Sequence, residues 1–217
     1  MKHYYCTLDT ETFGGASKPK GIYHLGGLVH DRQGNILACF NYLIAEHYGE
    51  IEKDSYAKKN FDRYAEMVKN GVVTVVPTEA MAVACVDSLL QYYSVEYVMA
   101  FNSGFDLTKT RCSELIKNRQ YIDIYLMAVE TLACRKKFSA FCHEHNLCSA
   151  SRKSVSTNAQ TFYAYLTNNP GYAEEHTALE DAKIELEIFL ACVRAHKPFT
   201  KNIHFYDAKP WDKVPRW

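Results

Sequence analysis

The alternation of hydrophobic and polar positions predicts three strands near the start of the chain. An apolar run ends at residues 9–11, a second strand covers residues 22–31, and a third covers residues 35–46. A glycine-containing loop and a short polar turn separate these segments, as in hairpin connections. The three segments therefore predict an antiparallel meander.

Helical periodicity dominates the rest of the chain, and two short apolar runs indicate further strands. Thr78, which follows a proline, is the expected N-cap of an amphipathic helix. The predicted elements are a polar helix over 55–71, the amphipathic helix over 80–93, a strand over 96–102, a helix over 103–118, a strand over 121–123, and mostly helix to about residue 194 with a loop around 149–157.

Strands followed by helices that alternate with two more strands indicate an α/β fold. We expect a mixed five-stranded sheet, an antiparallel meander plus parallel strands, flanked by helices. The sequence contains no internal repeats and no low-complexity segments, and one domain is expected over residues 1–195. A tail over residues 196–217 follows it.

This tail differs in composition from the rest of the chain. Its five lysine and arginine residues outnumber its two aspartates, and aromatic residues and prolines are interspersed among them. Such a segment can clamp a single nucleic-acid strand, although packing across the domain is the commoner role of a tail.

Composition limits the classes of partner. The chain has 217 residues and 47% hydrophobic content, enough to bury a substantial core. Lys plus Arg equals Asp plus Glu at 25 each, so the chain has no net positive charge with which to bind long nucleic acid non-specifically. Any nucleic-acid contact is therefore expected to be local.

The eight cysteines are expected to be reduced, because the chain is long for a disulfide scaffold and its first residues lack a secretory apolar segment. No apolar stretch approaches membrane-spanning length, so we expect a cytoplasmic protein with no membrane partner. A structural zinc site is an open alternative for one group, although its spacing matches no paired Cys-x-x-Cys site. This group comprises Cys134, Cys142, His143, His145 and Cys148.

The first candidate site residues are Asp9 and Glu11, at the end of the first strand. Residues i and i+2 of a strand project from the same side, so both carboxylates face the same way. Two neighbouring negative charges favour a bound cation. The same acid-x-acid spacing recurs at Glu50/Glu52, Glu52/Asp54 and Glu185/Glu187, where we expect only solvated charged faces.

Asp106 is the next candidate. It follows the strand over residues 96–102 by a few positions and opens a helix, where α/β sheets present ligands. Ser103 and Asp106 also match a capping box, in which the acid only satisfies a backbone N–H group. Both roles stay open for this residue.

His176 precedes a further predicted helix. Thr177 and Glu180 match a capping box, which starts the helix at Thr177 and leaves His176 just outside it. His176 is then placed to face a site rather than to lie on the helix surface.

Asp181 lies one turn inside this helix, on the side that carries Ile184, Ile188 and Cys192. A buried carboxylate without a partner is costly. This position therefore favours a metal ion, a cationic partner or a water-filled cleft beside Asp181. A lysine or arginine neighbour is the alternative.

Three motifs in order resemble the DEDDh branch of the DnaQ-like 3'-5' exonucleases, most of all its small stand-alone phage-type members. They are Asp-x-Glu in LDTET, Asn-x-x-Phe-Asp in FNSGFD and His-x-Ala-x-x-Asp in HTALED. The resemblance implies a ribonuclease H-like fold, four metal-binding acids and a histidine general base. These residues are Asp9, Glu11, Asp106 and Asp181, with His176 as the base.

The resemblance implies a two-metal mechanism, in which two Mg²⁺ or Mn²⁺ ions bound by the acids would support phosphodiester hydrolysis. The implied substrates are the 3' ends of single-stranded DNA or RNA, with a nucleoside monophosphate as product. Thr12, Phe13 and Asn102 are candidate substrate contacts, although Phe13 can equally be a core aromatic and Asn102 can shape the turn. Asp123 is expected to cap the next helix.

A non-catalytic module with the same fold, which binds nucleic acid or protein, is the alternative function. Because all four acids and the histidine are present, the sequence favours the enzyme. DNA and RNA are not distinguished, since that depends on a pocket for the 2'-hydroxyl. If the protein is phage-encoded, its place of action is the host cytoplasm.

Overall fold

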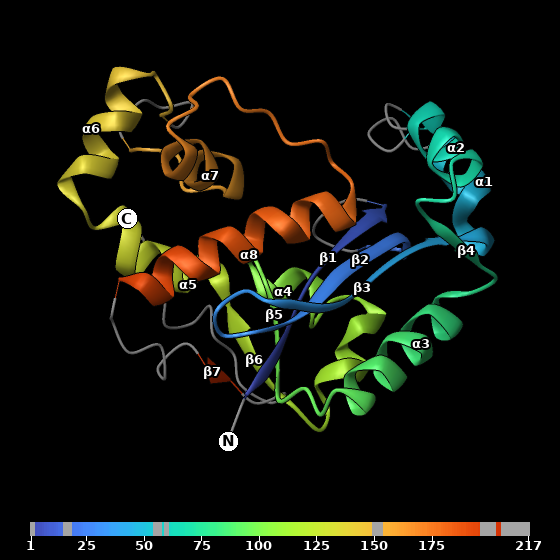
Figure 1. Ribbon diagram of the computed structural model, residues 1–217. Helices are drawn as coiled ribbons and strands as arrows, with labels where there is room; N and C mark the ends of the chain where they lie inside the picture. Colours follow the sequence, from blue (N-terminus) through green and yellow to red (C-terminus); the bar gives the residue numbers. More distant parts are fainter. Residues whose placement is uncertain are drawn as a thin grey trace.

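The computed structural model describes residues 3–14, 19–53, 58, 61–148, 154–195 and 203–204. Its centre is a mixed seven-stranded sheet in the order β4-β3-β2-β1-β5-β6-β7 (Figure 1). The strands are β1 (Tyr4–Phe13), β2 (Gly21–Asp31), β3 (Ile36–Ile44), β4 (Thr74–Val76), β5 (Tyr97–Ala100), β6 (Gln120–Asp123) and β7 (Ile203–His204).

The predicted meander is confirmed, because β1 pairs antiparallel with β2 and β2 pairs antiparallel with β3. β5 joins β1 in parallel, and β6 joins β5 in parallel. The α/β class is therefore confirmed, but the sheet has seven strands where the pattern predicts five. The two additional strands, β4 and β7, are three and two residues long and lie at the sheet edges. Such short strands carry too little alternation to be recognised.

Eight α-helices in the described residues surround the sheet. They are α1 (Tyr48–Ile51), α2 (Phe61–Lys69), α3 (Glu79–Tyr92), α4 (Ser103–Asp106), α5 (Ile124–Ala128), α6 (Lys136–Glu144), α7 (Ala159–Thr167) and α8 (Ala178–Arg194). Two 3₁₀ segments, η1 (Ala45–His47) and η3 (Arg111–Ile116), and a π segment, η4 (Val129–Ala133), complete the helical structure of the described residues. None of these helices is both long and apolar enough to cross a bilayer.

The two larger hydrophobic clusters lie on opposite faces of the sheet, because successive side chains of a strand point to opposite faces. Tyr5 of β1 packs in the cluster with α5 to α8, whereas its neighbour Cys6 packs in the cluster with α3 and η3. Met99 and Val98 of β5 divide in the same way. The sheet therefore lies between two helical layers, with α8 across one face and α3 on the other (Figure 1).

Several predicted helices differ in detail. The helix predicted over 80–93 is α3, and the Thr78 side chain accepts the Met81 N–H as expected of an N-cap. The helix predicted over 103–118 divides into α4, turns and η3, because Thr110 is extended and its side chain accepts the Cys112 N–H as the N-cap of η3. Within 55–71 the structure describes α2, and residues 54–57, 59–60 and 149–153 lie outside the described residues.

The tail is described only at Ile203 and His204, which form β7 against β6. Ile203 also packs against the cluster that contains α8. The other predicted features of residues 196–217, including their basic and aromatic side chains, lie outside the described residues.

Candidate active site

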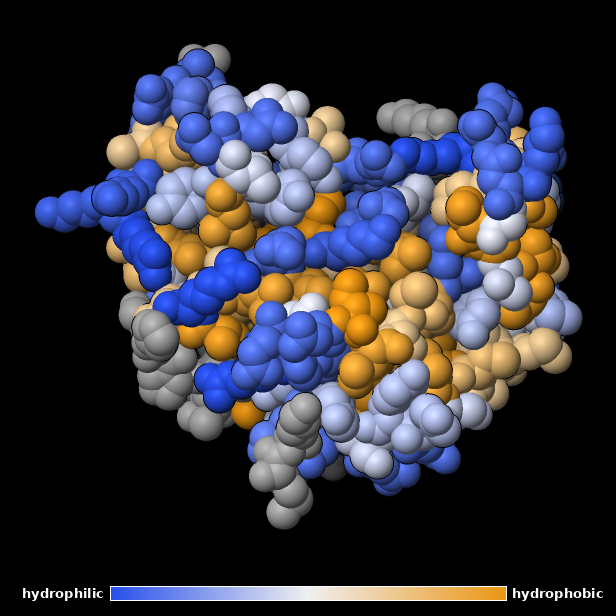
Figure 2. Space-filling view, viewed as in Figure 1, coloured by the Kyte–Doolittle hydropathy of each residue, from blue (hydrophilic) through white to orange (hydrophobic). Residues whose placement is uncertain are grey.

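One pocket of about 460 Å³ contains all five residues for which a catalytic role is predicted. Asp9, Glu11, Asp106, His176 and Asp181 all line it. They come from three segments that are far apart in the chain. The space-filling view is hollowed between the parts that carry α7 and α2, on the side where β1 ends (Figure 2).

The central strand positions two of the acids. Asp9 and Glu11 project from the same side of β1, as their i and i+2 spacing predicts, and both are partly exposed at the pocket wall. The Tyr23 hydroxyl of β2 donates to Glu11 Oε2 at 3.4 Å. A register shift between Glu11 and Thr12 interrupts the regular ladder beside the acid pair, and pairing continues to Phe13.

Asp106 is the last residue of α4, which follows β5, the strand next to β1. Asn102 follows β5 in the left-handed conformation, with φ 61° and ψ 52°, and turns the chain into α4. Asp106 is 3% exposed, and its Oδ1 accepts the Thr10 backbone N–H at 3.2 Å and the Thr10 hydroxyl at 2.5 Å. These bonds hold the Asp106 carboxylate beside β1.

The capping box proposed for Ser103 and Asp106 does not form. The Ser103 hydroxyl instead donates to Asp123 Oδ2 at 2.9 Å, because Asn102 rather than Ser103 occupies the N-cap position of α4. Asp123 caps α5 as predicted, and its side chain accepts the Leu126 N–H.

Helix α8 supplies Asp181 and is held against β2 at its first turn. The Ala178 N–H donates to the buried His24 Nδ1 at 3.2 Å, and His24 Nε2 lies 2.7 Å from Asn41 Oδ1. Burial lowers the pKa of His24 to about 4, which keeps the ring neutral and able to accept at Nδ1. A Cβ atom at Gly26 would lie 2.2 Å from the Leu179 nitrogen, so this contact requires glycine.

His176 lies just before α8, as the sequence predicts, with φ 53° in the left-handed region. The second predicted capping box is wrong, because the Thr177 side chain makes no cap bond although Thr177 is the N-cap residue. Glu180 is instead paired with Lys183 at 2.6 Å across one turn of the helix. The backbone of α8 is anchored by His24 in place of the box.

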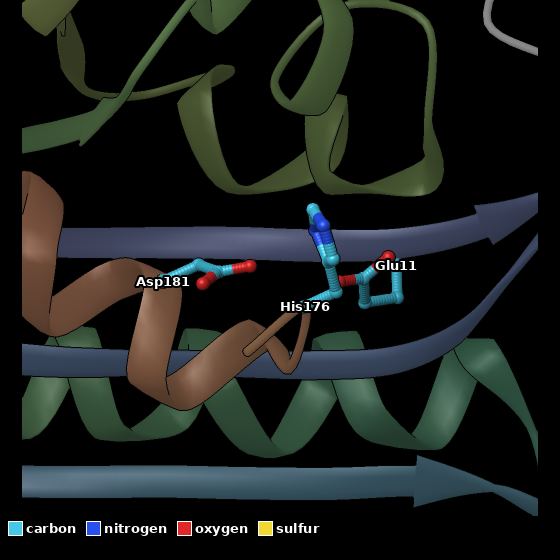
Figure 3. A group of neighbouring side chains, drawn as sticks. All are labelled: Glu11, His176 and Asp181. Atoms are coloured by element: carbon cyan, nitrogen blue, oxygen red, sulfur yellow. The ribbon is translucent and has the colours of Figure 1, made fainter. Parts of the chain in front are cut away.

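Three of the residues are close enough to share a cation. Ligand atoms of Glu11, His176 and Asp181 all lie within 4.8 Å of one another. Glu11 belongs to β1, His176 to the segment before α8 and Asp181 to the first turn of α8 (Figure 3). Among the described residues, no other group of histidine, cysteine or acidic side chains has this arrangement.

The acids of the pocket are strongly perturbed. Burial raises the pKa of Glu11 to about 7 and that of Asp106 to about 7. Burial, together with the charge of Glu11, raises the pKa of Asp181 to about 8. The pKa of Asp9 is well above its ordinary range, first through burial and then through the charges of Asp106 and Glu185. Without a cation, these groups therefore resist ionisation.

Sequence reasoning missed Glu174 and Glu185, which also line the pocket. The expectation that Glu185 and Glu187 form a solvated face is wrong for Glu185, which is 4% exposed. Residues two apart on a helix point to nearly opposite sides, so only Glu187 is exposed to solvent. The signal that identifies Glu185 is its i+4 spacing from Asp181.

The candidate substrate contacts separate into two groups. Asn102 lines the pocket, together with Phe101 and Phe105. The described lining does not include Thr12 or Phe13. The Phe13 side chain is 8% exposed and packs in a hydrophobic cluster beside His47.

The candidate zinc group does not bring three ligand atoms together among the described residues. Cys142 is buried in α6, as the pattern predicts. Cys148 is partly exposed in an isolated bridge with Val155 rather than in a helix, and its Sγ lies 3.6 Å from His143 Nδ1.

The strand order and the flanking helices define an α/β protein with a ribonuclease H-like fold. The crystal structure of cell-death related nuclease 4 has a similar fold, with a TM-score of 0.50 and 12% sequence identity. The similarity covers 88% of this chain and 64% of the nuclease chain, so the present chain spans less than two thirds of that protein. No protein-family model matches the sequence. No curated protein is similar to it in sequence.

Proposed function

We propose that this protein is a metal-dependent 3'-5' exonuclease that hydrolyses single-stranded nucleic acid from its 3' end. The observation that carries the proposal is the convergence of Asp9, Glu11, Asp106, His176 and Asp181 in one pocket. The fold shared with a nuclease structure is consistent with it. The domain over residues 1–195 would contain the whole site.

The donor set of the pocket suits a hard divalent cation. Carboxylate oxygens and water are the preferred ligands of Mg²⁺ and Mn²⁺. Oδ1 of Asp181 is buried without a hydrogen-bond partner, and a bound cation would satisfy it. Asp9, Glu11, Asp106 and Asp181 would hold two such ions, which when bound supply charge neutralisation and an acidified water for phosphodiester hydrolysis.

His176 would act as the general base. Its ring lies with Glu11 and Asp181 in the group that spans 4.8 Å, so it adjoins the proposed cation position. A neutral imidazole nitrogen can take the proton of the attacking water. The left-handed backbone at His176 turns the chain between the preceding segment and α8.

Two basic side chains, Lys109 and Arg111, closely follow Asp106 in the chain. Lys20, Lys109 and Arg111 line a separate pocket of about 110 Å³, together with Glu79. The Lys109 ammonium lies 6.0 Å from the centre of the Phe105 ring, and Phe105 lines the acidic pocket. We propose that these cations contact the backbone phosphates of the nucleic-acid strand, while Phe101 and Phe105 would contact its terminal base.

The direct test is digestion of single-stranded DNA and RNA oligonucleotides labelled at the 3' or the 5' end, with Mg²⁺, Mn²⁺ or EDTA. Successive loss of 3' nucleotides as monophosphates, only with metal, is the expected result. Asp9→Asn should abolish it, whereas Asp87→Asn, at a half-buried ion pair with Arg119 outside the pocket, should not. Metal-independent binding of the same strands without cleavage would instead identify a non-catalytic binding module.

A further inference from the structure

The carboxylate of Glu185 is buried in the candidate active site without a charged partner. Glu185 is 4% exposed, and its Oε2 atom has no hydrogen-bond partner. It lies one turn after Asp181 on α8, so both side chains are on the same side of the helix. Both line the same pocket.

The surroundings of Glu185 increase the cost of its burial. The described lining of the pocket contains six carboxylates, and His176 is its one basic residue. Asp106 and Asp181 are among the charged groups that act on Glu185, while a backbone hydrogen bond from Phe101 favours its charged form. Protonation would not remove the problem, because the Oε2 atom would still lack a partner.

We infer that Glu185 is a further cation-holding carboxylate of this site, in addition to Asp9, Glu11, Asp106 and Asp181. This inference rests on the proposed metal-dependent function. A bound divalent cation satisfies an otherwise orphaned carboxylate oxygen and offsets the repulsion among the acids. Glu185 thereby extends the acidic wall of the pocket along α8, beyond the position of Asp181.

The test is metal binding by the full chain, independent of any substrate. Mn²⁺ and Mg²⁺ are titrated into EDTA-treated and dialysed protein by calorimetry, and the melting temperature is followed over the same concentrations. Glu185→Gln keeps the size of the side chain and removes its charge. The variant should bind Mn²⁺ about tenfold more weakly and melt at a higher temperature than the wild type without metal.

Glu187→Gln is the matched control, because Glu187 lies on the same helix and is exposed. It should bind Mn²⁺ as the wild type does. Circular dichroism establishes that each variant is folded, and Glu185→Asp is a second variant that keeps the charge on a shorter side chain. Glu185→Asp should retain more of the Mn²⁺ affinity than Glu185→Gln.

Wild-type Mn²⁺ affinity in folded Glu185→Gln would overturn the inference, as would a wild-type protein that binds no metal. A wild type that binds Mn²⁺ through Glu185 but cleaves no oligonucleotide would overturn only the proposed exonuclease function. The two failures are therefore distinguishable.

Discussion

Asp9 on β1 is paired directly with Gly26 on β2, and the first turn of α8 lies on Gly26. Because Gly26 has no side chain, α8 can approach the sheet closely beside Asp9 of β1. Asp181 reaches the pocket on that helix. The distance between the acids of β1 and the acid of α8 depends on this contact.

Gly26→Ala should displace α8 from the sheet. A methyl group at this position would lie 2.2 Å from the Leu179 nitrogen, a contact that only backbone movement can relieve. We expect a loss of about 1–3 kcal/mol in the free energy of unfolding and a fall in nuclease rate of about 100-fold. Denaturant titration and a single-turnover assay measure both.

Gly49→Ala in α1 is the control, because an added Cβ there meets nothing within 4 Å. Equal losses in the two variants would show that the close approach at Gly26 has no special role.

His176→Ala should reduce turnover by about 10²–10⁴-fold while largely sparing substrate binding, since a general base acts in the chemical step. Single-turnover cleavage and equilibrium binding of a labelled strand separate the two effects. His143→Ala, at an exposed position of α6, should leave both unchanged. Near-normal cleavage by His176→Ala would remove this residue as the base.

The metal-free protein should lose stability as the pH rises. The pKa of Glu11 is raised from 4.5 to about 7 and that of Asp181 from 3.8 to about 8, so the folded chain binds these protons more tightly than the unfolded chain. The contribution of these two acids to stability is therefore greatest below the ordinary values and falls as the pH rises through the raised ones. Melting temperatures in EDTA between about pH 4 and about pH 8 measure the effect.

Divalent metal should reverse this trend, because it binds the ionised acids. The stabilisation by Mn²⁺ should be larger at about pH 8 than at about pH 5. A melting temperature in EDTA that rises through this range would contradict the perturbation of the acids.

Lys109→Ala should weaken binding of single strands and lower the salt slope of the affinity by about one, as expected for a phosphate contact. Fluorescence anisotropy with a labelled oligonucleotide at several salt concentrations measures the slope. Lys136→Ala removes an exposed charge on α6 and is the control. An unchanged slope in Lys109→Ala would exclude the phosphate contact.

The meander and the helix that carries Asp181 are predictable because their apolar periodicities are long and regular. The two parallel strands have only four residues each and are predictable as short apolar runs between helical segments. The edge strands β4 and β7 are too short for this signal. Thr10 and His24 are missed for a different reason. Their importance comes from partners that are 96 and 154 residues away in the chain, Asp106 and Ala178.

The burial of Glu185 is not recognised when its i, i+2 spacing from Glu187 is taken to place both acids on one solvated face. The spacing Glu185-x-Glu187 is a pair on a strand but not on a helix, where the two side chains diverge. On the helix, Glu185 lies nearer than Glu187 to the side that carries Asp181 and Cys192, and this distinguishes the two glutamates. Conversely, the two capping boxes are local matches that do not form. Asp123, 20 residues away, accepts the Ser103 hydroxyl, whereas Lys183, on the same helix, pairs with Glu180.

The pocket combines residues from both ends of the domain, from Asp9 on β1 to Asp181 and Glu185 on α8. During synthesis the acids of β1 exist long before α8 has been translated, and the pocket cannot assemble until that helix docks on Gly26. A nascent or truncated chain that ends before α8 would therefore lack the complete site. Under the proposed function, nuclease activity would appear only when the fold is complete, so incomplete chains would not cleave nucleic acid.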